Sequence, residues 1–524
     1  MNLFTKATPE ILGRLQALSS EIDLQAQDVA IILAAGHGKR IKSETSKMLH
    51  EVWGVPTVVR VSEAVKQGLG SDNQIIVVGI KAVAVAEAVG HCPHRVFAYQ
   101  AEQNGTGDAV RIALQNLPAD SFSGNVFVFP GDMGLLTADV VASLKKHFMK
   151  NCCDMMVLTG VYEGDPANNT YGRILRVPET DVDCTSSGDD FEKVIEIREH
   201  KDILALEANE TYRIQYKGRT YGFTREVLLN IPEFNTGVYA FKADQLRSHI
   251  DKLEADNVQR ELYITDLISI FNQNQMTVKA CQARDNRTVL GFNVKSVLKE
   301  MGNIARERVY DRLKDIITIQ DKDDFFIAYE VVDQIVELDK KHAPLDIVIG
   351  KGAYIGKDVQ MNKGVRIGNQ AHLSGRIVLG KGVRIQENVH LSTYAHQEMK
   401  IGQNTEIYQS DIIKGSLEIG ENCQIESSVN ITGSDEFPTR IGNNVVIKGT
   451  SYIFGSIVED DIWIEHSVLK CKFVERTVKK DGTVQPVRYV LPLPEGLDSI
   501  KDIPDRGSDT ELQDIYGIRK IKAG

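Results

Sequence analysis

The sequence of 524 residues lacks long apolar runs and is poor in cysteine. No stretch approaches the ~20 consecutive apolar residues of a membrane-spanning helix, so we expect no membrane insertion. Its seven cysteines include no Cys-x-x-Cys pair, which argues against a zinc site or a disulfide framework and favours reduced thiols. The N-terminus shows no signal-peptide pattern, and we therefore expect a cytoplasmic protein.

The chain also has no excess of positive charge. The net charge of −11 argues against a nucleic-acid-binding surface, although it permits one small basic pocket for a phosphorylated substrate. Hydrophobic residues make up 42% and charged residues 25% of the chain, as in soluble globular proteins. The length exceeds what one hydrophobic core supports and predicts several domains.

The pattern of the chain changes several times. Residues 1–28 carry apolar residues at helical spacing and predict an N-terminal helical extension. In residues 29–297, apolar strand-like runs alternate with helical patterns, which predicts an α/β domain with a mainly parallel sheet. Such sheets bind ligands at the carboxyl ends of their strands. Residues 298–344 are charged and helical in pattern, and we expect them to form a helical linker.

A repeat of six residues begins near residue 345. Aliphatic residues recur at Ile349, Ile355, Met361, Ile367, Leu373, Leu379, Ile385, Leu391, Ile401, Ile407, Ile413, Ile419, Ile425, Ile431, Ile441, Ile447 and Ile453. This period predicts a parallel β-helix of hexapeptide repeats over residues 345–470. Two steps of ten residues predict loops near 390–400 and 431–440 that leave the register unchanged. Residues 471–524 lose the period and are expected to form an irregular tail.

Glycines and basic residues follow the first strand-like run. The run 29–33 leads into Gly36 and Gly38, and then into Arg40 and Lys47. Glycines after a buried strand let backbone N–H groups approach phosphate oxygens closely. The segment is no Walker loop, and Ile41 replaces the third glycine of a dinucleotide fingerprint. Taken alone, it also fits a structural turn with solvated lysines.

Further motifs follow in a fixed order. The first is Leu33-Ala34-Ala35-Gly36-x-Gly38-x-Arg40, with Ser43, Lys47 and Leu49 after it. The others are residues 100–107, 131–132, 171–174, 199–202, 235–237, 261–266 and 291–293. This ordered set resembles the bacterial bifunctional N-acetylglucosamine-1-phosphate uridylyltransferase family. The resemblance implies a Rossmann-like nucleotidyltransferase domain with a mainly parallel mixed sheet, followed by a left-handed β-helix.

The resemblance also implies roles for single residues. The backbone of Leu33, Ala34, Ala35 and Gly36 and the side chain of Gln100 would read the base, and Gly105 and Thr106 would close over the uracil. Arg40 and Lys47 would be catalytic and hold the phosphates, while Asp132 and Asn293 would bind Mg²⁺ through hard oxygen atoms. Gly172, Glu199 and Asn235 would bind the sugar.

Some of these residues also have simpler interpretations. Asp132 fits a helix cap, Glu199 a solvated face, and Asn235 a turn. The chain departs from the family at Ser46 and Pro130, and its segments 177–196 and 203–232 are longer and enlarge the sugar side. These departures leave the identity of the sugar open.

The activity implied is the formation of a UDP-sugar, with UDP-N-acetylglucosamine as the best guess, and pyrophosphate from UTP and a sugar 1-phosphate. Two alternatives are a non-catalytic trimeric scaffold that binds sugar nucleotides and a pyrophosphorylase for another hexose 1-phosphate. The β-helix is expected to form a homotrimer through its flat faces. It lacks the Arg-Pro-Gly and Asn-Tyr-Asp motifs of relatives that acetylate glucosamine 1-phosphate, although His390 lies in a segment similar to their histidine segment. This argues against an added acetyltransferase activity.

Overall fold

The structure is a computed structural model that describes residues 4–36, 38–118, 121–207 and 210–492. Contacts divide the chain into two compact units, Met1–Arg308 and Val309–Gly524. Among the described residues, no helix is both long and apolar enough to cross a bilayer.

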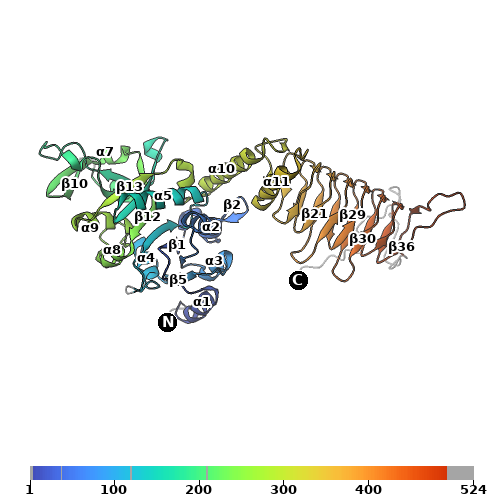
Figure 1. Ribbon diagram of the computed structural model, residues 1–524, viewed down its shortest axis with the longest axis horizontal. Coiled ribbons are helices and arrows are strands. Elements are labelled where there is room, and N and C mark those ends of the chain that lie inside the picture. Colours follow the sequence, from blue (N-terminus) through green and yellow to red (C-terminus); the bar gives the residue numbers. More distant parts are fainter. Residues whose placement is uncertain (1–3, 37, 119–120, 208–209, 493–524) are drawn as a thin grey trace, which may run out of the picture. The chain divides into compact units, whose positions relative to one another are not determined.

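A mixed, mostly parallel sheet forms the centre of the first unit (Figure 1). Its strands lie in the order β13 (Val278–Gln282), β7 (Met155–Val161), β12 (Glu233–Lys242), β6 (Asn125–Pro130), β1 (Asp28–Ala34), β4 (Gln74–Val78) and β5 (Arg95–Tyr99). β12 runs antiparallel to β6 and β7, and the other pairs along this path are parallel. β8 (Arg173–Arg176) pairs with β12 and with β9 (Val194–Arg198).

Alternate side chains of β1 enter two different cores, which explains why the run is apolar throughout. Ala30 and Ile32 pack on one face with α2 (Thr57–Leu69), α3 (Ala82–Val89) and α5 (Ala138–Asn151). Val29 and Ile31 pack on the other face with α4 (Thr106–Leu114), α8 (Ala243–His249) and α9 (Leu267–Gln273). A strand buried on both faces is typical of a parallel sheet between two helical layers, and the predicted α/β domain is confirmed.

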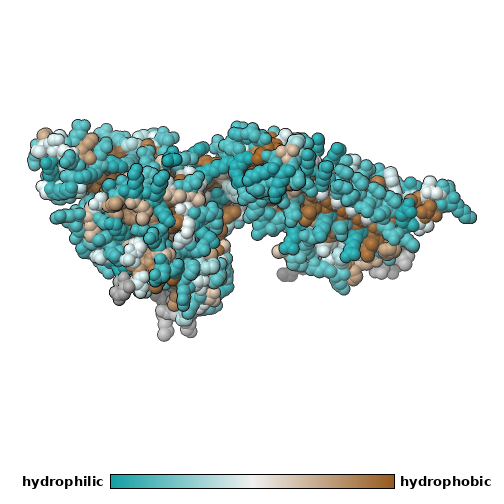
Figure 2. Space-filling view, viewed as in Figure 1, coloured by the Kyte–Doolittle hydropathy of each residue, from teal (hydrophilic) through white to brown (hydrophobic). Residues whose placement is uncertain are grey.

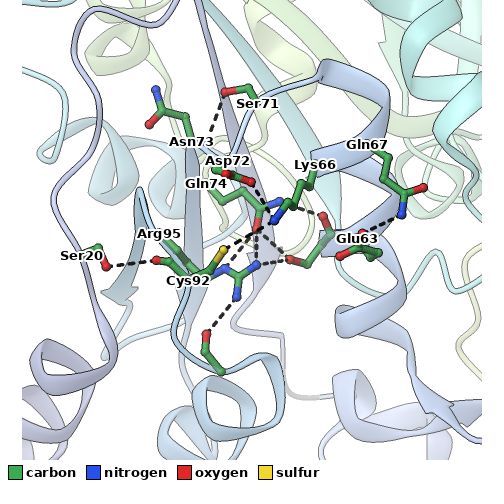
Figure 3. Close-up of polar contacts among 12 residues, drawn as sticks. Ser20, Glu63, Lys66, Gln67, Ser71, Asp72, Asn73, Gln74, Cys92 and Arg95 are labelled. Atoms are coloured by element: carbon green, nitrogen blue, oxygen red, sulfur yellow. Dashed lines mark hydrogen bonds and ion pairs between the residues drawn. The ribbon is translucent and has the colours of Figure 1, made fainter. Parts of the chain in front are cut away.

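The N-terminal segment covers the edge strand β5. It begins with α1 (Phe4–Leu18), where Leu15 is buried in the core. The backbone N–H of Ser20 donates to the carbonyl of Arg95 at 2.7 Å. The side chain of Arg95 donates to the side chain of Gln74 (Figure 3). It also donates to the carbonyl of Gly90. The extension therefore satisfies part of a sheet edge that would otherwise be unpaired.

Smaller elements complete the first unit. They are η1 (Lys39–Ile41), η2 (Lys47–Leu49), β2 (Glu51–Val52), β3 (Val55–Pro56), η3 (Pro166–Asn168), η4 (Gly188–Asp190), α6 (His200–Leu204), β10 (Thr211–Tyr216), β11 (Arg219–Thr224), α7 (Arg225–Asn230), η5 (Ile250–Lys252), η6 (Ile264–Asp266) and η7 (Asn286–Val289). The hairpin β10–β11 packs with β8 and β9 around Leu175, Ile195 and Tyr221. α10 (Lys295–Leu313) begins in this unit and ends in the second.

The second unit is built from three parallel sheets of very short strands (Figure 1). The first contains β14 (Thr318–Ile319), β16 (Val348–Ile349), β19 (Arg366–Ile367), β22 (Arg384–Ile385), β25 (Glu406–Ile407), β28 (Gln424–Ile425), β31 (Val446–Ile447), β34 (Trp463–Glu465) and β37 (Val487–Arg488). The second contains β15 (Phe326–Ile327), β17 (Tyr354–Ile355), β20 (His372–Ser374), β23 (His390–Ser392), β26 (Ile412–Gly415), β29 (Asn430–Gly433), β32 (Tyr452–Phe454) and β35 (Val468–Lys470). The third contains β18 (Val359–Gln360), β21 (Ile377–Leu379), β24 (Met399–Ile401), β27 (Leu417–Ile419), β30 (Thr439–Ile441), β33 (Ile457–Val458) and β36 (Phe473–Val474).

The hexapeptide positions form the core of this β-helix. Ile367, Ile385 and Ile407 pair in register along one sheet and are buried. The two ten-residue steps fall between β23 and β24 and between β29 and β30, and the ladders continue across them. The predicted β-helix is therefore confirmed as part of the fold.

The ends of the β-helix differ from the expected limits of 345 and 470. β14 and β15 lie within the segment expected to be a helical linker, and they precede α11 (Tyr329–His342). β36 and β37 continue the ladders beyond residue 470. Such two-residue strands have too little sequence pattern to be recognised without their neighbours. The rest of the predicted tail, from residue 493 onward, lies outside the described residues.

Candidate active site

Lys47, Asp132 and Asn293 meet at one point of the first unit. Asp132 follows the end of β6, and Lys47 is the buried first residue of η2. The Lys47 ammonium forms an ion pair with Oδ2 of Asp132 and donates to Oδ1 of Asn293 at 2.9 Å. The structure thus brings together one predicted phosphate-binding lysine and both predicted metal ligands.

An aromatic side chain packs beneath the cluster of Lys47, Asp132 and Asn293. Phe292 is fully buried, packs with Met301 of α10, and lies 5.4 Å below the Lys47 ammonium. Gly291 lies close to the carboxylate of Asp132: a Cβ atom added to this glycine would be 3.2 Å from Oδ2. Tyr171 donates its hydroxyl to the carbonyl of Gly291 at 3.3 Å, and burial raises its pKa to about 12. The phenol therefore remains a hydrogen-bond donor at neutral pH.

The predicted glycine loop passes directly against Lys47. Gly38 has a φ of 61°, and a Cβ there would lie 2.7 Å from Cβ of Lys47. Only glycine suits this combination of close approach and left-handed backbone. Ala34 and Ala35 are buried where β1 ends, Leu33 is half-buried, and Gly36 is exposed.

Arg40 differs from its predicted neighbours. It is exposed in η1. Among the described residues, no hydrogen bond or ion pair joins it to Lys47, Asp132 or Asn293. Its role in binding phosphate stays a prediction.

Three further residues predicted to bind the base lie together after β5. Gln100 is 3% exposed, and its Nε2 donates to Oδ2 of Asp108 at 2.8 Å and to the carbonyl of Gly105 at 3.3 Å. Gly105 has a φ of 111°, and a Cβ there would meet the carbonyl oxygen of Leu262 at 2.4 Å. Thr106 is exposed, and its Oγ1 accepts from the backbone of Ile264 at 3.1 Å. Hydrogen bonds and close packing therefore hold Gln100, Gly105 and Thr106 in one well-defined segment.

The predicted sugar-side residues also lie together. The backbone N–H of Asn235 donates to the carbonyl of Gly172 at 2.9 Å. A Cβ on Gly172 would lie 3.0 Å from Oε1 of Glu199, so the glycine leaves room for that carboxylate. Asn235 exchanges hydrogen bonds with the hydroxyl of Tyr239 at 2.8 and 3.0 Å, which orients its amide.

Carboxyl groups crowd this sugar side and alter its electrostatics. Burial raises the pKa of Glu199 to about 7, and the nearby charges of Asp202 and Asp266 add to the rise. Burial likewise raises the pKa of Glu196 to about 7 and that of Asp266 to about 6. These groups change their protonation near neutral pH.

Sequence reasoning missed Asp108 and Tyr212. Asp108 is an acidic residue in the first turn of α4, a signal visible in the sequence but usually explained by the helix dipole. Tyr212 belongs to β10, and its hydroxyl donates to Oε1 of Glu196 at 2.7 Å, while Arg198 stacks 4.4 Å from its ring. The sequence indicated only that this segment enlarges the sugar side.

The oxygen atoms at Lys47 suit a magnesium ion. Oδ2 of Asp132 and Oδ1 of Asn293 already converge on one cationic group, the Lys47 ammonium. Carboxylate and amide oxygens are hard ligands of the kind that Mg²⁺ prefers, and phosphates and water complete its shell in nucleotide sites. The residues present therefore fit the predicted cofactor.

Comparison with known proteins finds similar sequences. Residues 30–261 match the family described as MobA-like NTP transferase domain. Several curated relatives carry the name Bifunctional protein GlmU, including the following three. That of Acetivibrio thermocellus is 33% identical over 304 residues, 58% of this chain and 57% of the relative. That of Geobacillus thermodenitrificans is 34% identical over 331 residues, 63% of this chain and 62% of the relative. That of Caldanaerobacter subterraneus is 30% identical over 340 residues, 65% of this chain and 64% of the relative.

The chain resembles the bifunctional GlmU proteins. It spans less than two thirds of the length of these three GlmU relatives. The match confirms the predicted resemblance and the nucleotidyltransferase fold of the N-terminal part. The matching family model also supports the nucleotidyltransferase part of the predicted enzyme class.

Proposed function

We propose that the protein forms a UDP-sugar and pyrophosphate from UTP and a sugar 1-phosphate, with N-acetylglucosamine 1-phosphate as the preferred acceptor. The observation that carries this proposal is the contact of the Lys47 ammonium with both Asp132 and Asn293. A lysine beside two metal-binding oxygens and a glycine loop suits a triphosphate whose charge is redistributed during reaction.

The reaction needs positioning and charge stabilisation and no covalent nucleophile. An oxygen of the sugar phosphate attacks the α-phosphorus in line, and pyrophosphate leaves. Lys47 and Arg40 would neutralise charge on the phosphates, and Asp132 and Asn293 would hold Mg²⁺. Bound there, Mg²⁺ would supply further charge neutralisation on the phosphate oxygens.

Base and sugar would bind on separate sides of this centre. Gln100 and the backbone of residues 33–36, with Gly105 and Thr106, would hold the uracil. Gly172, Glu199 and Asn235 would bind the hydroxyl groups and the amide of the sugar. The contacts of Gly172 with both Glu199 and Asn235 support this assignment.

A substrate panel tests the proposal. Pyrophosphate release is measured with UTP, Mg²⁺ and several sugar 1-phosphates, and we expect the highest kcat/KM with N-acetylglucosamine 1-phosphate. Lys47→Met and Asp132→Ala should each lower kcat/KM about 100-fold or more, as the loss of one transition-state contact does. Asp139→Ala, at an exposed position in the first turn of α5, is the control and should stay close to wild type.

Absence of pyrophosphate release with every sugar phosphate would contradict the proposal. Calorimetric binding of UDP-N-acetylglucosamine without turnover would then favour the non-catalytic scaffold. Preferred turnover of another hexose 1-phosphate would keep the mechanism and correct the substrate.

A further inference from the structure

Asp108 links the predicted base-reading residue to a charged partner. It lies in the first turn of α4 and is 3% exposed. Its Oδ2 accepts from Nε2 of Gln100 at 2.8 Å, and its Oδ1 accepts from Arg111 at 2.5 Å. Arg111 and the N-terminal turn of the helix compensate the buried negative charge. Asp108 is therefore held on two sides, with one oxygen committed to Gln100.

This contact determines which end of the Gln100 amide faces Asp108. A carboxylate only accepts hydrogen bonds, so the group opposite Oδ2 must be the amide nitrogen. The second hydrogen of that nitrogen points to the carbonyl of Gly105, 3.3 Å away. Because both N–H groups of the amide are used within the protein, only its oxygen remains for a ligand.

The backbone of Gln100 is fixed as well. Its N–H donates to the carbonyl of Val78 at 2.8 Å, and its carbonyl accepts from Nε2 of Gln103 at 3.3 Å. Gly105, which accepts from the amide, is itself pressed against the backbone of Leu262. Gln100 is therefore fixed at its backbone and at its amide nitrogen, as a residue that discriminates between ligands requires.

We propose that Asp108 is a positioning residue that holds the Gln100 amide with its oxygen free, so that this side chain meets the nucleobase only as a hydrogen-bond acceptor. The inference rests on the proposed function, in which Gln100 reads the base. A base bound there must offer an N–H group. Uracil does so at N3, whereas the same ring nitrogen of cytosine carries no hydrogen. Asp108 would thus determine the preference for UTP over CTP without touching either nucleotide.

Asp108→Leu removes the hydrogen-bond acceptor and replaces it with a side chain of similar size. We expect its Kd for UTP, measured by calorimetry, and its KM for UTP to rise about tenfold or more, the scale of one lost hydrogen bond to a charged group. The preference for UTP over CTP should narrow, while the KM for the sugar phosphate changes less than twofold. A merely structural role would raise both KM values together or lower kcat alone.

Two controls accompany this variant. Asp139→Leu changes the matching acidic residue in the first turn of α5 and should leave the binding of UTP unchanged. Asp108→Asn keeps an oxygen that accepts from Gln100, and we expect it to retain most of the UTP affinity. Loss of affinity in Asp108→Asn as large as in Asp108→Leu would contradict the role of the acceptor.

An exchange of groups tests the contact even where Asp108→Leu does not fold. Gln100→Glu places two carboxylates face to face and should weaken the binding of UTP strongly. The double variant Gln100→Glu/Asp108→Asn restores a donor opposite an acceptor and leaves an acceptor for the base. We expect it to recover at least tenfold of the lost affinity, and a double variant no better than the single one would overturn the inference.

The outcomes separate this inference from the proposed function. Turnover by the wild type with an unchanged UTP affinity in Asp108→Leu would refute the positioning role alone. Absence of turnover with every sugar phosphate, together with the expected changes in UTP binding, would refute the proposed activity and support the positioning of Gln100.

Discussion

Glu199 is a carboxylic acid whose surroundings change what it does at neutral pH. Burial, with Asp202 and Asp266 nearby, raises its pKa to about 7. Below that pH, the protonated group can donate one hydrogen bond, and above it the carboxylate only accepts. A side chain proposed to accept from the sugar therefore works best above its own pKa.

The affinity for the sugar phosphate should accordingly depend on pH. The ionised fraction of a group with a pKa near 7 increases roughly tenfold between pH 6 and pH 8. We expect the KM for the sugar phosphate, taken relative to that of Glu199→Gln at the same pH, to fall by about that factor over this range. Glu199→Gln is the reference because its side chain cannot ionise. The variant also corrects for titration of the substrate. Parallel pH profiles of wild type and Glu199→Gln would contradict the prediction.

The sequence allowed many contacts at the scale of single residues to be predicted. Lys47, Asp132 and Asn293 meet although they belong to different parts of the chain, at the start of η2, after β6 and just before α10. Asp108 and Tyr212 were missed, because their partners are set by how α4 and β10 pack. A motif indicates the type of chemistry, whereas the hydrogen-bond partner of a buried group depends on tertiary contacts.

At the scale of the elements, the β-helix buries an acidic residue, Asp411, beside the aliphatic residues of its core. Asp411 precedes β26, is fully buried, and accepts from the backbone of Val429 at 2.8 Å. Its Oδ2 has no hydrogen-bond partner among the residues that the structure describes. Burial raises its pKa from 3.8 to about 8, and Glu426 adds to the rise. The folded β-helix therefore keeps this carboxyl protonated at neutral pH.

This shift makes the stability of the β-helix depend on pH. Between about pH 4 and pH 8 the unfolded chain releases the proton of Asp411 and the folded chain keeps it, so the contribution is full below pH 4 and is lost as pH rises. The slope is at most about 1.4 kcal/mol per pH unit. The Tm of Asp411→Asn minus the Tm of the wild type should therefore be larger at pH 8 than at pH 5. An equal difference in Tm at both pH values would contradict the prediction.

The six-residue period was sufficient to predict the β-helix as an element, but not its limits. Long series such as Ile367, Ile385 and Ile407 report an inward-facing ladder directly. β14 and β37 contribute only two residues each, and their strand structure depends on pairing with β16 and β34. Such strands exist because a neighbouring coil offers hydrogen bonds.

On the scale of the whole molecule, the outer face of one β-helix sheet carries aromatic and apolar residues. Tyr354 and His372 stack with ring centroids 4.4 Å apart, and His372 stacks on His390 at 4.8 Å. Ile412 and Tyr452 on the same sheet are 39% and 38% exposed. Figure 2 shows apolar residues exposed on this unit as well. We interpret this sheet as the contact face of the predicted homotrimer.

The mass in solution tests this interpretation. Sedimentation should give three times the chain mass of 58.2 kDa. Ile412→Glu and Tyr452→Glu should shift the assembly toward the monomer, because buried unpaired charge is costly at an interface. Arg384→Glu, on an exposed position of the first β-helix sheet, is the matched control. A monomeric wild type, or a trimer that both variants leave intact, would contradict the assignment.

The sequence by itself determined the α/β domain with its mainly parallel sheet, the hexapeptide coil and the types of residue at the candidate active site. These follow from local periodicity and from glycine and charge at strand ends, which neighbouring residues encode. Tertiary structure decided which oxygen of Asp108 holds Gln100, how far burial shifts Glu199 and Asp411, and where the β-helix begins. Those properties arise from desolvation and from partners distant in the chain, and no local pattern specifies them.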